Sequence, residues 1–534
     1  MRSSRSQDGI LNRIAPAVLG GVLVLLPCIV HAQETAQGAV SPGPQIAAAS
    51  PSAEPSARSG VENSPNAGQG EQQNAAKRNP LSPASQPALP PQSNGLLGDF
   101  GHGDRTSLAK HGFTLSGHLV SEGAGNITGG TPLGGTAVAR GTAVSSELAF
   151  GFDADFGKIA AKSGAGILHL LITERFGSSL AAQTLGNLVS VQEIYGDGQT
   201  TRFTELNYEQ PLLHSHVDIK LGKINQEDDF IAGSTYWGGN LYCFYQNNNI
   251  CGTPAAVPIN NGVVPLGTEG YVYYPSTVWG VRVKGSPAPD FYIEAAALQA
   301  NPVINTRAGG AYFGFYGSTG TELPLETGLT LRNKAGDLIG NVRVGGYFDT
   351  STVQSYNNRL STYSVSNNPS NVAGLATIPL QYVRGRSAAD VQFDHLLEGS
   401  SKPNETGTVL FLASTYSDPN SALISSFFDA GIVRRGTFAH RKNDTVGVGF
   451  ATENFNPRLQ NFELQLQSLG YAIPYTGSEK AFEFNYGWQA ASWWLLRPGF
   501  QYVLNPNGEE TNIPRGLTVP KSALVFGLTS VITF

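Results

Sequence analysis

From about residue 95 onward, the chain consists of short segments in which apolar and polar residues alternate, separated by Gly, Pro, Asn and Asp. In 482–489 every even position is aromatic, and the odd positions hold Glu, Asn, Gly and Gln. The same two-residue period recurs in 144–156, 494–504 and 524–534. Successive side chains of a strand point to opposite faces, so this period predicts antiparallel β-strands.

The apolar face of these segments indicates what surrounds them. A strand of a soluble sandwich also alternates, because one face meets the core and the other meets water. Here, however, the apolar face is a continuous band of large aromatic rings, and Trp488, Trp493 and Trp494 cluster near segment ends. Aromatic girdles at the two membrane boundaries are typical of outer-membrane barrels. The pattern therefore favours a barrel whose rings face lipid.

Counting the alternating segments gives the size of the barrel. We predict an all-β fold, a single transmembrane antiparallel β-barrel of about 16 strands over 95–534. The predicted strands are 112–124, 142–156, 165–176, 202–210, 215–225, 277–286, 290–301, 325–334, 338–350, 378–396, 405–417, 421–434, 444–456, 480–490, 493–504 and 521–534. Side chains cannot fill a barrel of this width, so a water-filled channel is expected.

The first 94 residues lack the alternating pattern of apolar and polar positions. Arg residues followed by an apolar run, 14–30, and a small residue at Ala32 predict a signal peptide over 1–32, cleaved after Ala32. The competing interpretation, a membrane anchor, is disfavoured because Pro and Gly interrupt the run. The Pro/Ala/Gln/Ser-rich segment 33–94 is expected to be a disordered extension, serving either as a spacer or as an unconstrained tail.

Composition narrows the function and the location. Only 14% of residues are charged, and the net charge is −6 without Lys/Arg blocks, so nucleic-acid binding is not expected. Export through a signal peptide and a barrel fold together predict the outer membrane of a Gram-negative bacterium. Lipid and lipopolysaccharide are then expected neighbours. Phe534 closes the last strand, and outer-membrane barrels resemble one another in ending this way, so we expect the barrel-assembly machinery to bind it.

Charged residues occur at positions that the alternation turns into the lumen. These pore-lining candidates are Glu205, Asp218, Lys220, Arg282, Lys284, Glu294, Arg343, Glu483 and Arg497. An anion pore would be dominated by Lys and Arg, and a cation pore by Asp and Glu. The mixture suits neutral, hydroxyl-rich solutes such as sugars, because Arg donates and Glu accepts hydrogen bonds. The alternative is that these charges line the lumen without touching solute.

The long connection 226–276 is the best candidate for a loop that narrows the channel. Its constriction candidates are Asp228, Asp229, Tyr236 and Trp237. The aromatic rings could stack on a pyranose, or they could pack to fix the loop. Cys243 and Cys251 also lie in this loop, and in an oxidising compartment they are expected to form a disulfide that pins it.

The sequence does not favour an enzyme. It contains no Gly-x-Ser-x-Gly, His-Glu-x-x-His or P-loop motif. His214 and His216 fall at a predicted tight turn rather than in a cluster of metal ligands. No metal and no cofactor is expected. The alternative to a channel is a secreted, soluble β-rich protein that binds or hydrolyses carbohydrate.

Several motifs, in this order, resemble the carbohydrate-selective porin family of Gram-negative outer membranes (the OprB type). They are Leu221–Asn225 with Asp228–Phe230, Cys251–Pro254, Tyr274–Pro275, Trp279–Val283, Asp429–Gly431 with Arg435–Gly436, and Leu496–Val503 with Asn505–Gly508. The resemblance implies a sixteen-stranded channel, monomeric or trimeric, for passive diffusion of glucose and related sugars. It also implies a pore narrowed by charged residues, for which Arg282 and Arg497 are the candidates. The extension 33–94 is not part of the family pattern.

Overall fold

The computed structural model describes residues 95–130, 141–161, 164–192, 194–195, 199–247, 249–250, 272–356, 381–468, 470, 473–509 and 520–534. The strands are β1 (Phe113–Thr128), β2 (Thr142–Asp155), β3 (Ile167–Gly177), β4 (Thr201–Leu212), β5 (Val217–Ile224), β6 (Thr235–Tyr236), β7 (Gly239–Asn240), β8 (Val278–Ala288), β9 (Phe291–Ala300), β10 (Gly320–Arg332), β11 (Leu338–Ser355), β12 (Gln381–Gly399), β13 (Gly407–Ser417), β14 (Ile424–Arg435), β15 (Thr445–Phe455), β16 (Ser478–Ala491), β17 (Trp494–Leu504) and β18 (Ala523–Thr533). The α-helices are α3 (Phe100–Lys110), α4 (Phe156–Ile159), α5 (Gln226–Asp229) and α7 (Pro457–Ser468). Short 3-10 or π turns are η1 (Ala181–Leu185), η2 (Leu213–Ser215), η3 (Leu241–Phe244), η4 (Pro302–Asn305), η5 (Arg307–Gly309) and η6 (Pro506–Gly508).

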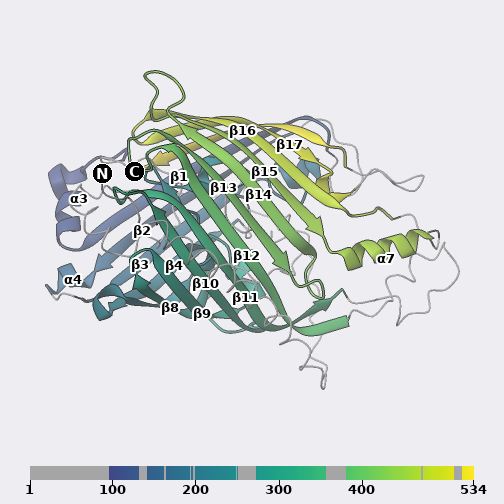
Figure 1. Ribbon diagram of the computed structural model, residues 1–534, viewed down its shortest axis with the longest axis horizontal. Coiled ribbons are helices and arrows are strands. Elements are labelled where there is room, and N and C mark those ends of the chain that lie inside the picture. The colour runs from purple at the N-terminus through teal and green to yellow at the C-terminus, as the bar shows by residue number, and fades with distance from the viewer. Residues whose placement is uncertain are drawn as a thin grey trace, which may run out of the picture. The chain divides into compact units, whose positions relative to one another are not determined.

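The strands close into one barrel (Figure 1). Within the described residues, sixteen strands pair antiparallel with their neighbours in chain order, and β1 closes the ring against β18. The two short strands β6 and β7 form a separate hairpin. The predicted all-β, sixteen-stranded antiparallel barrel is therefore confirmed, because each predicted segment overlaps one barrel strand.

The two faces of the wall differ as the alternation predicted. On β16, Phe482 and Phe484 are 43% and 53% exposed on the outside, while Glu483 between them is 3% exposed on the inside. On β17, Phe500 likewise faces outward and Gln501 inward. Rings on the outside and polar groups on the inside suit a lipid environment around a polar lumen. They do not fit a soluble protein, which would bury these rings.

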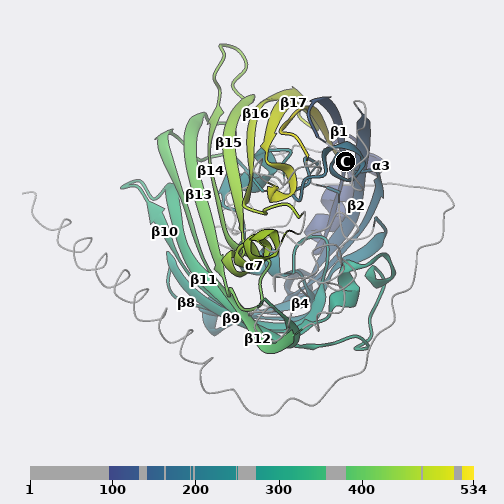
Figure 2. The same ribbon diagram turned by 90° about the vertical axis from the view of Figure 1, so that its right-hand side faces the viewer.

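The two ends of the barrel carry different connections. Residues 95–110 and Phe534 lie at one end, together with short turns such as 213–216 and 492–493. The long connections, including the one that carries α7, lie at the other end, from which Figure 2 looks into the barrel. Short turns face the periplasm in such barrels, which makes the α7 end external. None of the helices in the described ranges has the length and apolarity that a membrane-crossing helix needs.

The helix α3, which the alternation did not predict, closes over the seam between β1 and β18. The Arg105 guanidinium is buried and donates a 2.9 Å hydrogen bond to the main-chain oxygen of Phe534. The Leu96 amide donates to the Thr533 carbonyl at 2.8 Å. Residues that precede the first strand thus bond the end of the last strand, in addition to the β1–β18 pairing.

We expect Arg105→Ala to lower the heat resistance of the barrel. The change removes a charge-assisted bond worth about 1.5–3 kcal/mol at the seam where the barrel closes. The midpoint temperature at which the folded band converts to the unfolded band in gel electrophoresis measures the effect. Lys110→Ala, an exposed change on the same helix, is the control. Equal midpoints for the two variants would show that α3 does not stabilise the seam.

Candidate functional site

The described parts of the connection after β5, 225–247, 249–250 and 272–277, fold into the barrel rather than away from it; they are called the inward loop below. The inward loop begins with α5, whose first turn is capped by the Asn225 side chain, which accepts from the Glu227 amide at 2.9 Å. The segment then follows the inner wall from β5 to β17, as the hydrogen bonds described below show. Its return arm, 272–277, lies against β3 and β2, where the Tyr274 hydroxyl donates to Glu147 at 2.7 Å. The loop therefore reduces the open cross-section of the lumen.

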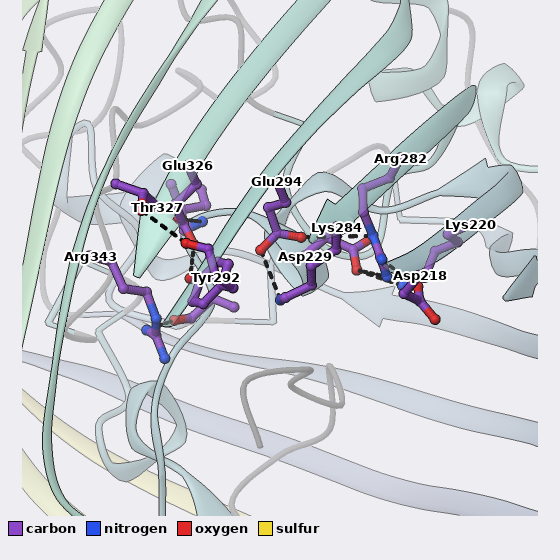
Figure 3. A network of polar contacts seen from close by, with 12 residues as sticks. Asp218, Lys220, Asp229, Arg282, Lys284, Tyr292, Glu294, Glu326, Thr327 and Arg343 are labelled. Atoms are coloured by element: carbon purple, nitrogen blue, oxygen red, sulfur yellow. Dashed lines mark hydrogen bonds and ion pairs between the residues drawn. The ribbon is translucent and has the colours of Figure 1, made fainter. Parts of the chain in front are cut away.

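Arg282 is the centre of a cluster of charges on the inner wall (Figure 3). Its guanidinium contacts Asp218, Glu209 at 3.1 Å and Asp229 at 3.1 Å. Glu294 lies 3.7 Å from its Nε. The Arg282 side chain is fully buried among these four carboxylates. The cluster joins the wall strands β4, β5, β8 and β9 to α5 of the inward loop.

Two lysines complete the cluster. Lys220 Nζ lies 2.7 Å from Asp229 Oδ1, and Lys284 Nζ lies 2.9 Å from Glu294 Oε1. Asp229 belongs to the loop rather than to a spanning strand. Burial alone would raise the pKa of the Asp229 carboxyl, but Arg282 and Lys220 outweigh it and hold that pKa below its ordinary value. The loop is therefore held to the wall by an ionised carboxylate.

A second group of contacts continues along the wall on β9 to β12 (Figure 3). The Tyr292 hydroxyl donates to Glu326, and Glu326 accepts the Ile231 amide of the loop at 2.7 Å. Arg343 donates to the Ala232 carbonyl and, at 3.1 Å, to Gln392. These groups bind the main chain of the loop, so they are bonded to protein rather than left open to solute.

Tyr236 and Trp237 are packed within the inward loop. The Tyr236 hydroxyl bonds Asp394 of β12, and the Trp237 indole donates to the Ser400 carbonyl at 2.6 Å. Both rings are buried, and the Trp237 ring meets Phe244 edge-on at 5.9 Å. Most of the surface of both rings is therefore in contact with protein, as expected if the rings pack to fix the loop.

Glu483 holds the middle of the loop, around Gln246 and Asn247. Its carboxylate accepts the Gln246 amide at 3.0 Å and the Asn247 amide at 2.9 Å. The Asn485 side chain donates to it at 2.7 Å. Beside it, the Asn247 amide group donates to Gln501 at 3.0 Å. The loop is thus attached to β16 and β17, across the lumen from its start.

The remaining candidates occupy varied positions. Glu205 is half-buried at a bulge of β4, in register with the inward Leu171. Asp228 is buried in α5, and Arg497 is buried on the inner face of β17. Cys251 lies outside the described residues, as does the side chain of Cys243, so the disulfide stays a prediction. The segments 1–32 and 33–94 also lie outside them.

A second connection, 178–195, also folds inward, which the sequence reasoning missed. Its Leu188 and Val189 amides donate to Glu479 of β16 at 2.8 and 3.0 Å. The Ile194 amide donates to Glu122 of β1 at 3.1 Å. A second loop, also fixed by buried carboxylates, therefore narrows the lumen together with the first.

The sequence reasoning also missed Glu209 and His169. Glu209 has the same strand parity as Glu205, so the alternation of β4 could have placed it in the lumen. His169 Nδ1 lies 2.7 Å from Asp153, and its Nε2 lies 3.5 Å from Glu209. Side chains of Glu209 and Asp218 keep 20% and 18% of their surface exposed, so this side of the cluster meets the open lumen.

Chemically, the lumen offers fixed hydrogen-bond donors and acceptors of both signs. Arginine and lysine donate, carboxylates accept, and the amides of residues such as Gln392 and Gln501 do both. Among the described residues, no three potential ligands converge in a way that could hold a metal ion. The arrangement suits a polar solute that exchanges its water shell for such groups as it passes.

Comparison with known proteins agrees with this geometry. A family model described as "Carbohydrate-selective porin, OprB family" matches residues 139–534. Porin B of Pseudomonas aeruginosa is 26% identical over 436 residues, covering 79% of this chain and 89% of the relative. A putative porin, QuiX, of Acinetobacter baylyi is 25% identical over 440 residues, covering 77% and 89%.

A solved structure shares the fold. The high-pH structure of Pseudomonas putida OprB has a TM-score of 0.69 and 24% identity, covering 84% of this chain and 100% of the other. A family match across most of the chain, on a closed barrel with a polar lumen, establishes the family. This chain belongs to the carbohydrate-selective porin family, whose members are channels of the outer membrane rather than enzymes.

Proposed function

We propose that the barrel conducts neutral monosaccharides such as glucose by passive diffusion, and that the inward loop sets the size limit. The observation that carries the proposal is the Arg282 cluster, in which cations and carboxylates alternate beside the open lumen. Glu209 and Asp218 offer their exposed oxygens to sugar hydroxyls, while Arg282 fixes their orientation. A hydroxyl can both donate and accept, so it can replace water at each group in turn.

Charge balance explains why ions gain no advantage in this proposal. An ion entering the lumen loses water and meets a cluster in which three cations face four carboxylates, so the charges largely offset one another and the net field is weak for either sign. A neutral sugar binds water less strongly than an ion does, so it gives up less hydration energy on entry. In the lumen it regains hydrogen bonds like those that it made to water. The cluster therefore filters by hydrogen-bonding capacity rather than by charge.

Liposome swelling tests this proposal. Proteoliposomes containing the full chain should swell faster in isosmotic glucose than in lysine or glutamate of similar size. Liposomes without protein provide the baseline. Entry of lysine or glutamate as fast as glucose would contradict the sugar preference, and swelling equal to the baseline would contradict the channel itself.

We also propose that the chain reaches the membrane by export with cleavage after Ala32. The support is the Arg-rich start, the apolar run and the small residue at the cut site. Mass spectrometry of the protein purified from outer membranes should then find Gln33 at the amino terminus. A chain that retains Met1 would contradict cleavage. Phe534 is proposed to be bound by the assembly machinery before α3 covers it.

A further inference from the structure

A small cavity lies on the periplasmic half of the lumen, between the inward loop and strands β14 to β17. Its wall includes Trp237, Phe244, Arg435, Asn443, Gln489 and Arg497. The aromatic groups come from the loop, and the polar groups come from the strand ends and the turn 436–444. The Arg282 cluster contributes no residue to this wall, so the cavity is a separate feature of the lumen.

Arg435 is a buried cation whose hydrogen-bond partners among the described residues are neutral. Its side chain is 3% exposed and donates to the Trp237 carbonyl at 3.3 Å and to Asn443 Oδ1 at 2.9 Å. In the part of the chain that the structure describes, it makes no ion pair within 4.0 Å. The neighbouring carboxylate, Asp444, is bound instead by Arg441 at 2.7 and 3.0 Å.

A buried guanidinium without a counter-charge is costly, so its retention calls for an explanation. Arg282, by contrast, is equally buried but surrounded by carboxylates. An anion that entered the cavity would supply the charge that Arg435 lacks. Arg497, also buried, lines the same wall and adds a second guanidinium on one side of the space.

The size of the cavity limits what part of a ligand can enter it. Its free volume is about 30 Å³, which corresponds to roughly two water molecules. A carboxylate group fits such a space, whereas a whole pyranose ring does not. Gln489 and Asn443 are partly exposed at the wall, so a ligand can keep its hydroxylated part in the lumen. Planar carboxylates also match the forked donors of arginine.

We propose that this cavity binds the carboxylate of a sugar acid, so that the channel carries acidic as well as neutral sugars. The inference deepens the proposed function and rests on it. Arg435 supplies the counter-charge, Arg497 adds a second donor group, and Trp237 with Phe244 closes the apolar side. The solute is a hydroxylated carboxylate, held by its charged end while its hydroxyls remain among the polar groups of the lumen.

Blocking of the ion current through the full chain in planar bilayers tests the proposal. At neutral pH, D-glucuronate should reduce the current at a concentration about tenfold lower than glucose, because one charge-assisted contact is added. Arg435→Gln should remove this preference by lowering the ratio of glucuronate to glucose affinity about tenfold. Arg435→Lys, which keeps the charge without the fork, should retain part of it.

Arg434→Gln provides the matched control. Arg434 is the adjacent residue, faces outward and bonds Thr408 and Glu398, so its loss should leave the preference intact. The inference is overturned if glucuronate binds wild-type protein no tighter than glucose, if acetate blocks as well as glucuronate, or if Arg434→Gln and Arg435→Gln behave alike. A channel that responds to neither sugar contradicts the proposed function instead.

Discussion

Arg282→Met is expected to convert the channel to a cation-preferring pore and to slow glucose entry. The substitution removes the buried cation that contacts Asp218, Glu209 and Asp229, and leaves their charges unbalanced. Breaking a buried pair in this way costs about 3–5 kcal/mol, so the packing of α5 against the wall should loosen as well. The zero-current potential across a bilayer in a KCl gradient measures the change in ion preference.

The matched control for this substitution is Arg332→Met. Arg332 pairs with Asp290 at 2.6 Å, but both side chains are partly exposed at a turn. Exposed pairs contribute about 0–1 kcal/mol, so the control should keep the wild-type potential and the wild-type rate of glucose entry. An Arg282→Met channel with unchanged potential would show that the cluster does not face the conducting path.

Glu483→Ala is expected to release the inward loop and widen the pore. The carboxylate accepts two loop amides and the Asn485 side chain, and each such charged contact is worth about 1.5–3 kcal/mol. Removing it leaves buried amide donors without acceptors, which favours a detached loop. Single-channel conductance should rise, and raffinose should enter proteoliposomes that exclude it in the wild type.

Glu398→Ala separates this effect from a general loss of acid groups. Glu398 lies at the end of β12 with its side chain 60% exposed and pairs with Arg434. Its loss should leave both conductance and the size limit unchanged. If Glu483→Ala folds and conducts like the wild type, the loop is held by its other contacts and Glu483 is not its anchor.

The barrel could be predicted from the sequence because a strand in a membrane wall has only two environments. Phe482, Glu483 and Phe484 face lipid, lumen and lipid in turn. The two-residue period therefore indicates both the strand structure and the face to which each side chain points. The same logic placed Arg282 and Glu483 in the lumen. Past the bulge of β4, Glu205 pairs with the inward Leu171, so the break in the period changes the parity of residues before it, such as Phe203, rather than that of Glu205.

Partners inside the lumen could not be predicted, because they join residues far apart in sequence. Nothing near Asp229 indicates that Arg282, 53 positions away, will contact it, and Glu483 is 237 positions from Gln246. The burial of Trp237 also depends on the loop turning inward. The helix α3 has a weak apolar pattern, and it is held by tertiary contacts such as that of Arg105 with Phe534, which the local sequence does not reveal.

A sugar that passes through a polar lumen narrowed by a fixed loop must occupy that lumen for a finite time. The most direct test is a titration of glucose against the single-channel current of the full chain in a planar bilayer. We expect open channels whose current falls in a saturable manner as glucose occupies the lumen. Channels whose current is unaffected by glucose, apart from the effect of bulk viscosity, would contradict it.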